Sequence, residues 1–96
     1  MFIITLTYLK PAEEIDALLA AHRAYLHEQY ENGMFLISGR MVPRTGGVIL
    51  AVADSRADIE AVIELDPFKE AGAASYQITE FVPTMAAEIF SQFKQG

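Results

Sequence analysis

Phe2–Leu9 reads FIITLTYL, and this stretch decides the kind of fold. β-Branched and aromatic side chains fill it, a composition that is typical of a β-strand. No positively charged segment precedes it, and Lys10-Pro11 interrupts it. We therefore interpret the stretch as a strand and not as a secretory signal peptide.

A long helix is predicted directly after this strand, from Pro11 to Glu31. Proline suits the first turn of a helix, and Glu13 and Glu14 are favourable near its positive end. Asn32-Gly33 is a good signal for the C-terminal end.

Two further strands follow, at Met34–Val42 and Val48–Ala53. The turn-forming segment Pro43-Arg44-Thr45-Gly46-Gly47 separates them. Val48–Ala53 reads VILAVA and shows almost no alternation of apolar and polar residues. Such a run is typical of a strand that is covered on both faces.

A second helix is predicted from a capping box, with Ser55 followed three residues later by Asp58. Its apolar face consists of Ile59, Val62 and Ile63. Asp66-Pro67 interrupts this helix and caps a short turn that ends near Gly72.

Ser75–Val82 is the fourth predicted strand, and Pro83 ends it. Thr84–Lys94 is predicted as a last helix, with an apolar side made of Ala86, Ile89, Phe90 and Phe93. The order of elements is βαββαβ plus a C-terminal helix. This order predicts an α+β fold with a ferredoxin-like antiparallel sheet and both main helices on one face.

Length and hydropathy predict one domain, residues 1–96, with an interface to another subunit. Ninety-six residues leave no room for a second core. The composition is 52% hydrophobic and the mean hydropathy is +0.23, so apolar surface is left over for a homodimer. The C-terminal helix could add to that contact or dock on its own subunit.

Charge and composition exclude several classes of partner. Thirteen acidic and seven basic residues give a net charge of −6, and no stretch clusters the basic ones. Nucleic acid and an anionic membrane surface are therefore not expected as partners. No run reaches the roughly 18–20 apolar residues that span a bilayer, and cysteine is absent. We expect a cytoplasmic protein.

His22 is the most informative single residue. At about 100° per residue it falls on one helix face with apolar neighbours, namely Ile15, Leu18, Leu19 and Leu26. An unpaired buried polar group costs about 1–3 kcal/mol, so the ring needs a partner, and we predict Asp66. His22 is then either a core histidine, of the kind that bonds a backbone carbonyl, or a general acid or base.

Asp66 also has two interpretations. Followed by Pro67, it is a good N-cap. It could instead accept a hydrogen bond from the imidazole of His22 and fix its tautomer. The two roles are expected to coexist only if one carboxylate oxygen remains free.

Other polar residues are weaker candidates. His27 points about 140° away from His22, so the two cannot share a metal ion and no metal site is expected. Arg23, Arg40 and Arg44 could receive an anion or a phenolate, or be ordinary surface charges. Ser38 could form a polar pocket wall, although no G-x-S-x-G elbow marks it as a nucleophile.

Four segments, in this order and spacing, resemble the YCII-related (YciI-like) family: AHRAYL at 21–26, ENGMFLISGR at 31–40, VPRTGGVILA at 42–51, and DPF at 66–68 followed by AG at 71–72. The resemblance implies a ferredoxin-like fold that dimerises into an α/β-barrel-like assembly. It also implies that His22 and Asp66 form the family's catalytic dyad in a pocket. Members with an assigned reaction act on small ring compounds such as chlorinated hydroxyquinones, by elimination without a cofactor. Arg40 departs from relatives that carry proline after the glycine.

Three functions remain open at this point. The first is a cofactor-independent lyase or isomerase that acts on a small anionic or phenolic molecule, with His22 moving a proton, Asp66 orienting it, and Arg44 or Arg23 holding negative charge. The second is a module that binds a small metabolite without reaction. The third is a structural dimerisation domain.

Overall fold

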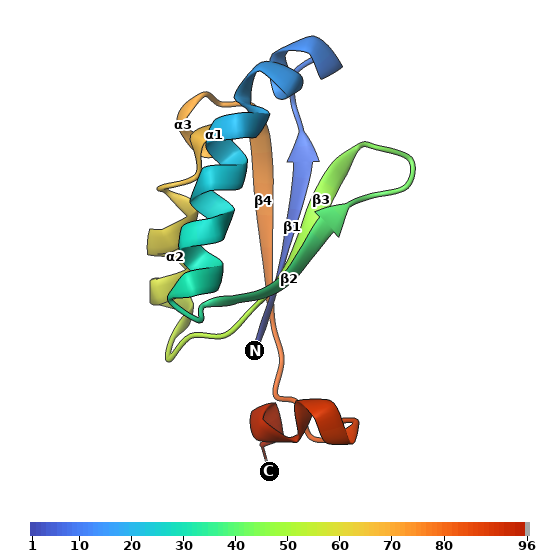
Figure 1. Ribbon diagram of the computed structural model, residues 1–96, viewed down its shortest axis with the longest axis vertical. Helices are drawn as coiled ribbons and strands as arrows, with labels where there is room; N and C mark the ends of the chain where they lie inside the picture. Colours follow the sequence, from blue (N-terminus) through green and yellow to red (C-terminus); the bar gives the residue numbers. More distant parts are fainter. Residues whose placement is uncertain (96) are drawn as a thin grey trace.

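A four-stranded antiparallel sheet lies at the centre of the molecule, which is described over residues 1–95 by a computed structural model (Figure 1). The elements follow the order β1 (Phe2–Tyr8), α1 (Ala12–Glu31), β2 (Phe35–Arg40), β3 (Gly46–Ala51), α2 (Arg56–Ile63), α3 (Pro67–Glu70) and β4 (Ala74–Glu80). The strands are arranged β2-β3-β1-β4, and every neighbouring pair is antiparallel. The helices cover one face of the sheet. The predicted α+β, ferredoxin-like arrangement is therefore confirmed.

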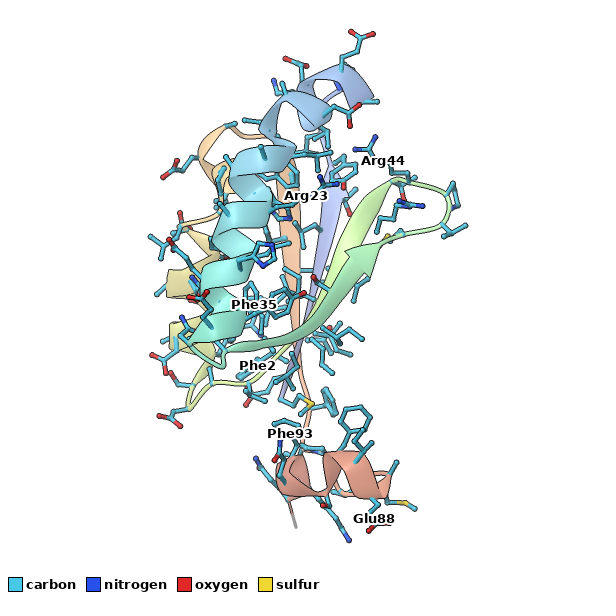
Figure 2. All side chains as sticks on the ribbon, viewed as in Figure 1. Phe2, Arg23, Phe35, Arg44, Glu88 and Phe93 are labelled. Carbon is cyan, nitrogen blue, oxygen red and sulfur yellow. The ribbon has the colours of Figure 1, made fainter. Side chains whose placement is uncertain are left out.

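The core lies between this sheet face and the helices. Along β1, Phe2, Ile4 and Leu6 are buried in alternation, as expected for a strand with one covered face. Phe35 from β2 and Ile15 from α1 belong to the same cluster, and Figure 2 labels Phe2 and Phe35 within it. Each such side chain contributes about 1.5–3 kcal/mol through burial, so this cluster fixes where α1 lies on the sheet.

The opposite face of the sheet is not covered within one chain. Val48 on β3 is 39% exposed and Ile37 on β2 is 65% exposed. The prediction that Val48–Ala53 is covered on both faces requires a second subunit on this face, so it stays a prediction. A continuous apolar run predicts that both faces avoid water, but it does not say which molecule covers the second face.

A β-bulge in β2 changes which residues face the helices. Phe35 lies opposite Ala51, but the register shifts before Ile37, which lies opposite Leu50. Strict alternation would place Ile37 on the same face as Phe35. The extra residue instead turns Ser38 and Arg40 toward the helix side, because a bulge puts two residues opposite one.

The predicted bounds of the first helix, Pro11–Glu31, agree with α1 to within one residue. Gly33, in the predicted stop signal of α1, has a φ of +83°, a conformation that glycine adopts without strain. The three later strands differ from their predicted ranges by one or two residues at each end. No helix among residues 1–95 is both long and apolar enough to cross a membrane.

The predicted helix Thr84–Lys94 is wrong. Its first residues are not helical, and only a 3₁₀ helix, η1 (Glu88–Phe93), forms beyond the end of the sheet. Ile89 and Phe90 of the predicted apolar side remain 79% and 52% exposed. Most helical stability in proteins comes from packing an apolar face, and here that face finds little to pack against.

Gly46 allows β3 to approach β1 closely, and this contact gives a test of the fold. A Cβ atom at Gly46 would lie 1.8 Å from the carbonyl oxygen of Leu6, a backbone atom that cannot move aside. Gly46→Ala is expected to lower the free energy of unfolding by about 3 kcal/mol or more. The melting temperature should fall by at least about 10 °C, as measured by circular dichroism.

Gly39→Ala is the matched control, because a Cβ atom there would have no heavy atom within 4 Å. It should leave the melting temperature unchanged or raise it slightly. Equal melting temperatures for the two variants would contradict the close approach of β1 and β3.

Candidate functional site

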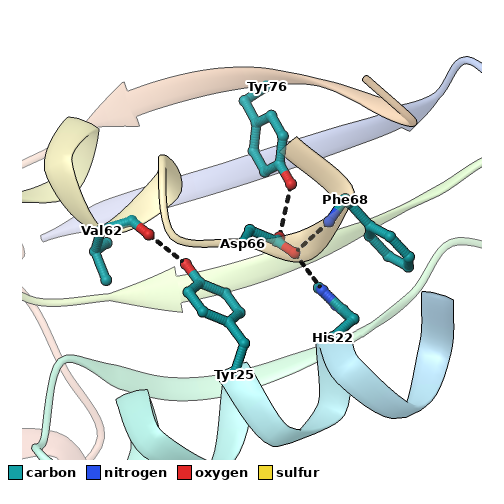
Figure 3. Close-up of polar contacts among 6 residues, drawn as sticks. All are labelled: His22, Tyr25, Val62, Asp66, Phe68 and Tyr76. Atoms are coloured by element: carbon teal, nitrogen blue, oxygen red, sulfur yellow. Dashed lines mark hydrogen bonds and ion pairs between the residues drawn. The ribbon is translucent and has the colours of Figure 1, made fainter. Parts of the chain in front are cut away.

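A fully buried carboxylate, that of Asp66, forms the centre of the site (Figure 3). Its Oδ1 lies 2.8 Å from Nδ1 of His22 and 3.0 Å from the backbone nitrogen of Phe68. Its Oδ2 accepts a 2.6 Å hydrogen bond from the hydroxyl of Tyr76. A carboxylate can only accept hydrogen bonds, so Nδ1 of His22 carries the proton between the two groups.

The local sequence explains how Asp66 reaches this position. It is the N-cap of α3, with Pro67 in the first turn, and the cap bond is the one from Phe68 N–H. The cap and the contact with His22 therefore coexist, and both use Oδ1. The expectation that one oxygen must stay free was wrong, since Oδ2 is occupied by Tyr76; a carboxylate has room for about four hydrogen bonds.

His22 is held on two sides. Its ring stacks on Phe68, with ring centroids 4.1 Å apart and planes 14° apart. Its side chain is 12% exposed, and the ring lines a pocket. Within residues 1–95 nothing hydrogen-bonds Nε2, so the nitrogen opposite Asp66 is available to a ligand.

Two tyrosines enclose the pair, and the sequence did not identify their roles. The Tyr25 hydroxyl donates a 2.8 Å hydrogen bond to the carbonyl of Val62. Burial, together with the charge of Asp66, raises the pKa of Tyr25. Burial raises the pKa of Tyr76 as well, and so does its hydrogen bond to Asp66. Both phenols therefore stay protonated and act as donors at neutral pH.

A pocket of about 460 Å³ opens in front of His22, among α1, β1 and the β2–β3 hairpin. The four residues predicted to bind a ligand all line it: Arg23, Ser38, Arg40 and Arg44. Asp66 is not part of the wall and lies behind the imidazole. Apolar side chains complete the lining, among them Leu19, Leu26 and Phe68. The pocket therefore combines one imidazole nitrogen, several cationic groups and an apolar surface.

The polar residues that line the pocket differ in whether another side chain already bonds them. Nη2 of Arg44 donates a 2.6 Å hydrogen bond to Oδ1 of Asp16, and its guanidinium carbon lies 5.9 Å from the centre of the Tyr8 ring. Ser38 shares a hydrogen bond with Tyr30. Arg23 and Arg44 come from opposite walls, α1 and the hairpin turn (Figure 2).

His27 lies on the exposed side of α1 and does not line the pocket. In the described part of the chain, residues 1–95, no three His, Asp or Glu side chains are grouped so that they could hold a metal ion.

The sequence profile of the YCII-related domain matches residues 1–82. The chain belongs to this family. No curated protein sequence matches this YCII-related chain. Among solved structures, it is similar to 5-chloro-2-hydroxyhydroquinone dehydrochlorinase from Burkholderia phenoliruptrix AC1100, in complex with 2,5-dihydroxybenzoquinone. The TM-score is 0.71 at 20% identity, and the match covers 86% of this chain and 95% of the other, which shows a shared fold.

The raised pKa values of Tyr25 and Tyr76 predict how stability depends on pH. Below about pH 10, phenols are protonated in both folded and unfolded chains, so their stabilising contribution is fully present. Above that pH the unfolded chain releases phenol protons that the folded chain retains, so the free energy of unfolding falls as pH rises. Urea unfolding between about pH 9 and pH 11 should show this fall.

The double variant Tyr25→Phe/Tyr76→Phe should show a shallower fall over the same range. At neutral pH, Tyr76→Phe alone should cost about 1–3 kcal/mol, because Oδ2 of Asp66 loses its donor. Parallel curves for wild type and the double variant would show that these phenols do not couple to folding.

Proposed function

We propose that this protein is a small-molecule enzyme of the lyase or isomerase type that works without a cofactor. One observation carries the proposal: Nδ1 of His22 is held by the buried Asp66, and His22 itself lines a pocket. This arrangement fixes the tautomer that leaves a lone pair on Nε2. A histidine oriented in this way is suited to act as a general base.

The first chemical step is removal of a proton from the ligand by Nε2. In an elimination at saturated carbon, the electrons of the broken C–H bond form a new double bond, and a leaving group on the neighbouring carbon departs with its own electron pair. In an isomerisation, the electrons move into a conjugated carbonyl and the proton returns at another carbon. In both cases the imidazole becomes positive beside Asp66, whose negative charge stabilises it.

The cationic lining supports the same chemistry. Proton removal next to a carbonyl or on a hydroxylated ring places negative charge on an oxygen atom. Arg23 and Arg44 line the same pocket as His22 and can meet that charge. His22, oriented by Asp66, would then accept the proton, while the arginines would stabilise the negative charge on the oxygen.

The name of the similar solved structure gives a second, chemical line of support for the proposal. Its name describes a dehydrochlorination, which removes a hydrogen and a chlorine from one ring compound. On a chlorinated hydroquinone ring the base takes a proton from a hydroxyl group, the carbon that bears chlorine gains a proton, and chloride then leaves with the electron pair of the C–Cl bond as a second hydroxyl group loses its proton. Negative charge develops on the ring oxygens during these steps and needs stabilisation. The lining around His22 offers both a base and cationic groups for that charge. We therefore take a hydroxylated or anionic ring compound as the first substrate class to test.

We further propose that the protein works as a homodimer. Ile37 and Val48 lie on the sheet face that no helix covers, and Met85 and Ile89 near the C-terminus are 88% and 79% exposed. Exposed apolar patches of this kind mark interfaces more often than free surface. A second copy placed on this sheet face would bury it and would leave the pocket on the helix side accessible.

The catalytic proposal predicts that His22→Gln and Asp66→Asn lose turnover. With 5-chloro-2-hydroxyhydroquinone as the probe substrate, chloride release should fall by about 10²–10⁴-fold in each variant. His27→Gln is the matched control, since this exposed histidine lies on the same helix and outside the pocket. It should behave as wild type, and circular dichroism checks that all three variants are folded.

Unchanged turnover in both His22→Gln and Asp66→Asn would remove the pair from the mechanism. Wild-type protein that binds 2,5-dihydroxybenzoquinone but releases no chloride during long incubation would indicate a binding module instead. A large stability loss in His22→Gln together with absence of any ligand binding would indicate a purely structural pair.

A further inference from the structure

Positive charge is concentrated in the pocket of an otherwise acidic chain. The whole chain carries a net charge of −6 with seven basic residues, yet Arg23, Arg40 and Arg44 all line this one pocket. Among the described residues 1–95, Asp16 is the only carboxylate in its lining. This concentration of positive charge in a net acidic chain points to an anionic ligand.

Each arginine comes from a different element, so the three converge on the pocket through the fold. Arg23 follows His22 on α1. Arg40 is on the helix side of β2 because the bulge shifts the register. Arg44 is in the turn between β2 and β3. Within residues 1–95, Arg23 and Arg40 form no ion pair, so their charges are free to meet a ligand.

Asp16 already occupies part of this cationic region. It lies on α1 two turns before Arg23, and its Oδ1 accepts the 2.6 Å hydrogen bond from Arg44 on the hairpin. This pair joins the two walls of the pocket. Both side chains are largely exposed, at 57% for Asp16 and 36% for Arg44, and exposed ion pairs are weak. A ligand anion can therefore displace Asp16 from Arg44.

We propose that the pocket binds a small organic oxyanion, with Asp16 as a built-in competitor that sets its specificity. The carboxylate, enolate or phenolate oxygens of the ligand lie on Arg23, Arg40 and Arg44, and its apolar body packs on Leu19 and Leu26. Asp16 bonds the guanidinium of Arg44 when no ligand is bound. A ligand anion that binds Arg44 more strongly displaces the Asp16 carboxylate. This inference rests on the proposed function, because it names the substrate class of the same pocket.

Simple probes test the anion preference. Benzoate and benzamide have nearly the same size and shape, and only benzoate is charged. By isothermal titration at neutral pH, benzoate should bind at least about tenfold more tightly than benzamide. Arg23→Gln should remove most of this difference. Arg56→Gln is the control, since Arg56 pairs with Glu60 outside the pocket.

If Asp16 competes with the ligand for Arg44, its removal should increase benzoate affinity. Asp16→Asn should tighten benzoate binding about three- to tenfold and leave benzamide binding unchanged. Glu13→Gln removes the same charge from an exposed position on the same helix and outside the pocket, so it should leave both affinities unchanged. Titration with 2,5-dihydroxybenzoquinone, compared with benzoate, then shows whether enolate oxygens or a carboxylate fit the arginines better.

Several results would overturn the inference. These are equal affinities for benzoate and benzamide, the same benzoate affinity for Asp16→Asn and Glu13→Gln, or no benzoate binding by either wild type or Asp16→Asn. The catalytic proposal fails separately. If His22→Gln keeps both turnover and the benzoate preference, the anion site stands and the role of His22 as a base is wrong. If Asp16→Asn changes nothing while His22→Gln loses turnover, the reverse holds.

Discussion

The structure depends on the burial of one ionisable group, the carboxylate of Asp66. A carboxyl group without exposure to water is strongly unfavourable unless it is bonded on all sides. Here three donors from three elements meet it: an imidazole from α1, a backbone N–H from α3 and a phenol from β4. The same bonds therefore hold the helix layer against the edge strand and fix the orientation of His22. Fold and site share one polar centre.

Local signals in the sequence were sufficient for most of the fold. The proline at the start of α1 and Asn32-Gly33 at its end are features of neighbouring residues, and the structure bears them out. A histidine in an apolar helical stripe needed a polar partner, and an aspartate before a proline was a visible cap. These local signals show that His22 needs a polar partner and that Asp66 is a cap, and the family resemblance is what implies that the two residues meet.

The remainder depended on long-range geometry that no local pattern contains. Tyr76 alternates with Ile78 along β4, which indicates an inward face but not the carboxylate that its hydroxyl meets. The bulge that directs Arg40 appears only in the pairing of β2 with β3. The C-terminal segment has helical periodicity, but within residues 1–95 its apolar side finds little surface to cover. A sequence pattern shows which side chains require burial or a polar partner. The tertiary structure decides whether they obtain it.

The pocket has two walls of very different character, and this division bears on how the protein can change. Behind His22 the carboxylate of Asp66 is fully buried and hydrogen-bonded to three donors, so substitutions there disturb folding. The arginines and Asp16 on the other side are solvent-exposed, where most substitutions alter stability by less than about 0.5 kcal/mol. Under the proposed function, ligand preference can thus drift through the exposed wall during evolution while the wall behind His22 stays constant. One scaffold of 96 residues can in this way serve a succession of different small molecules.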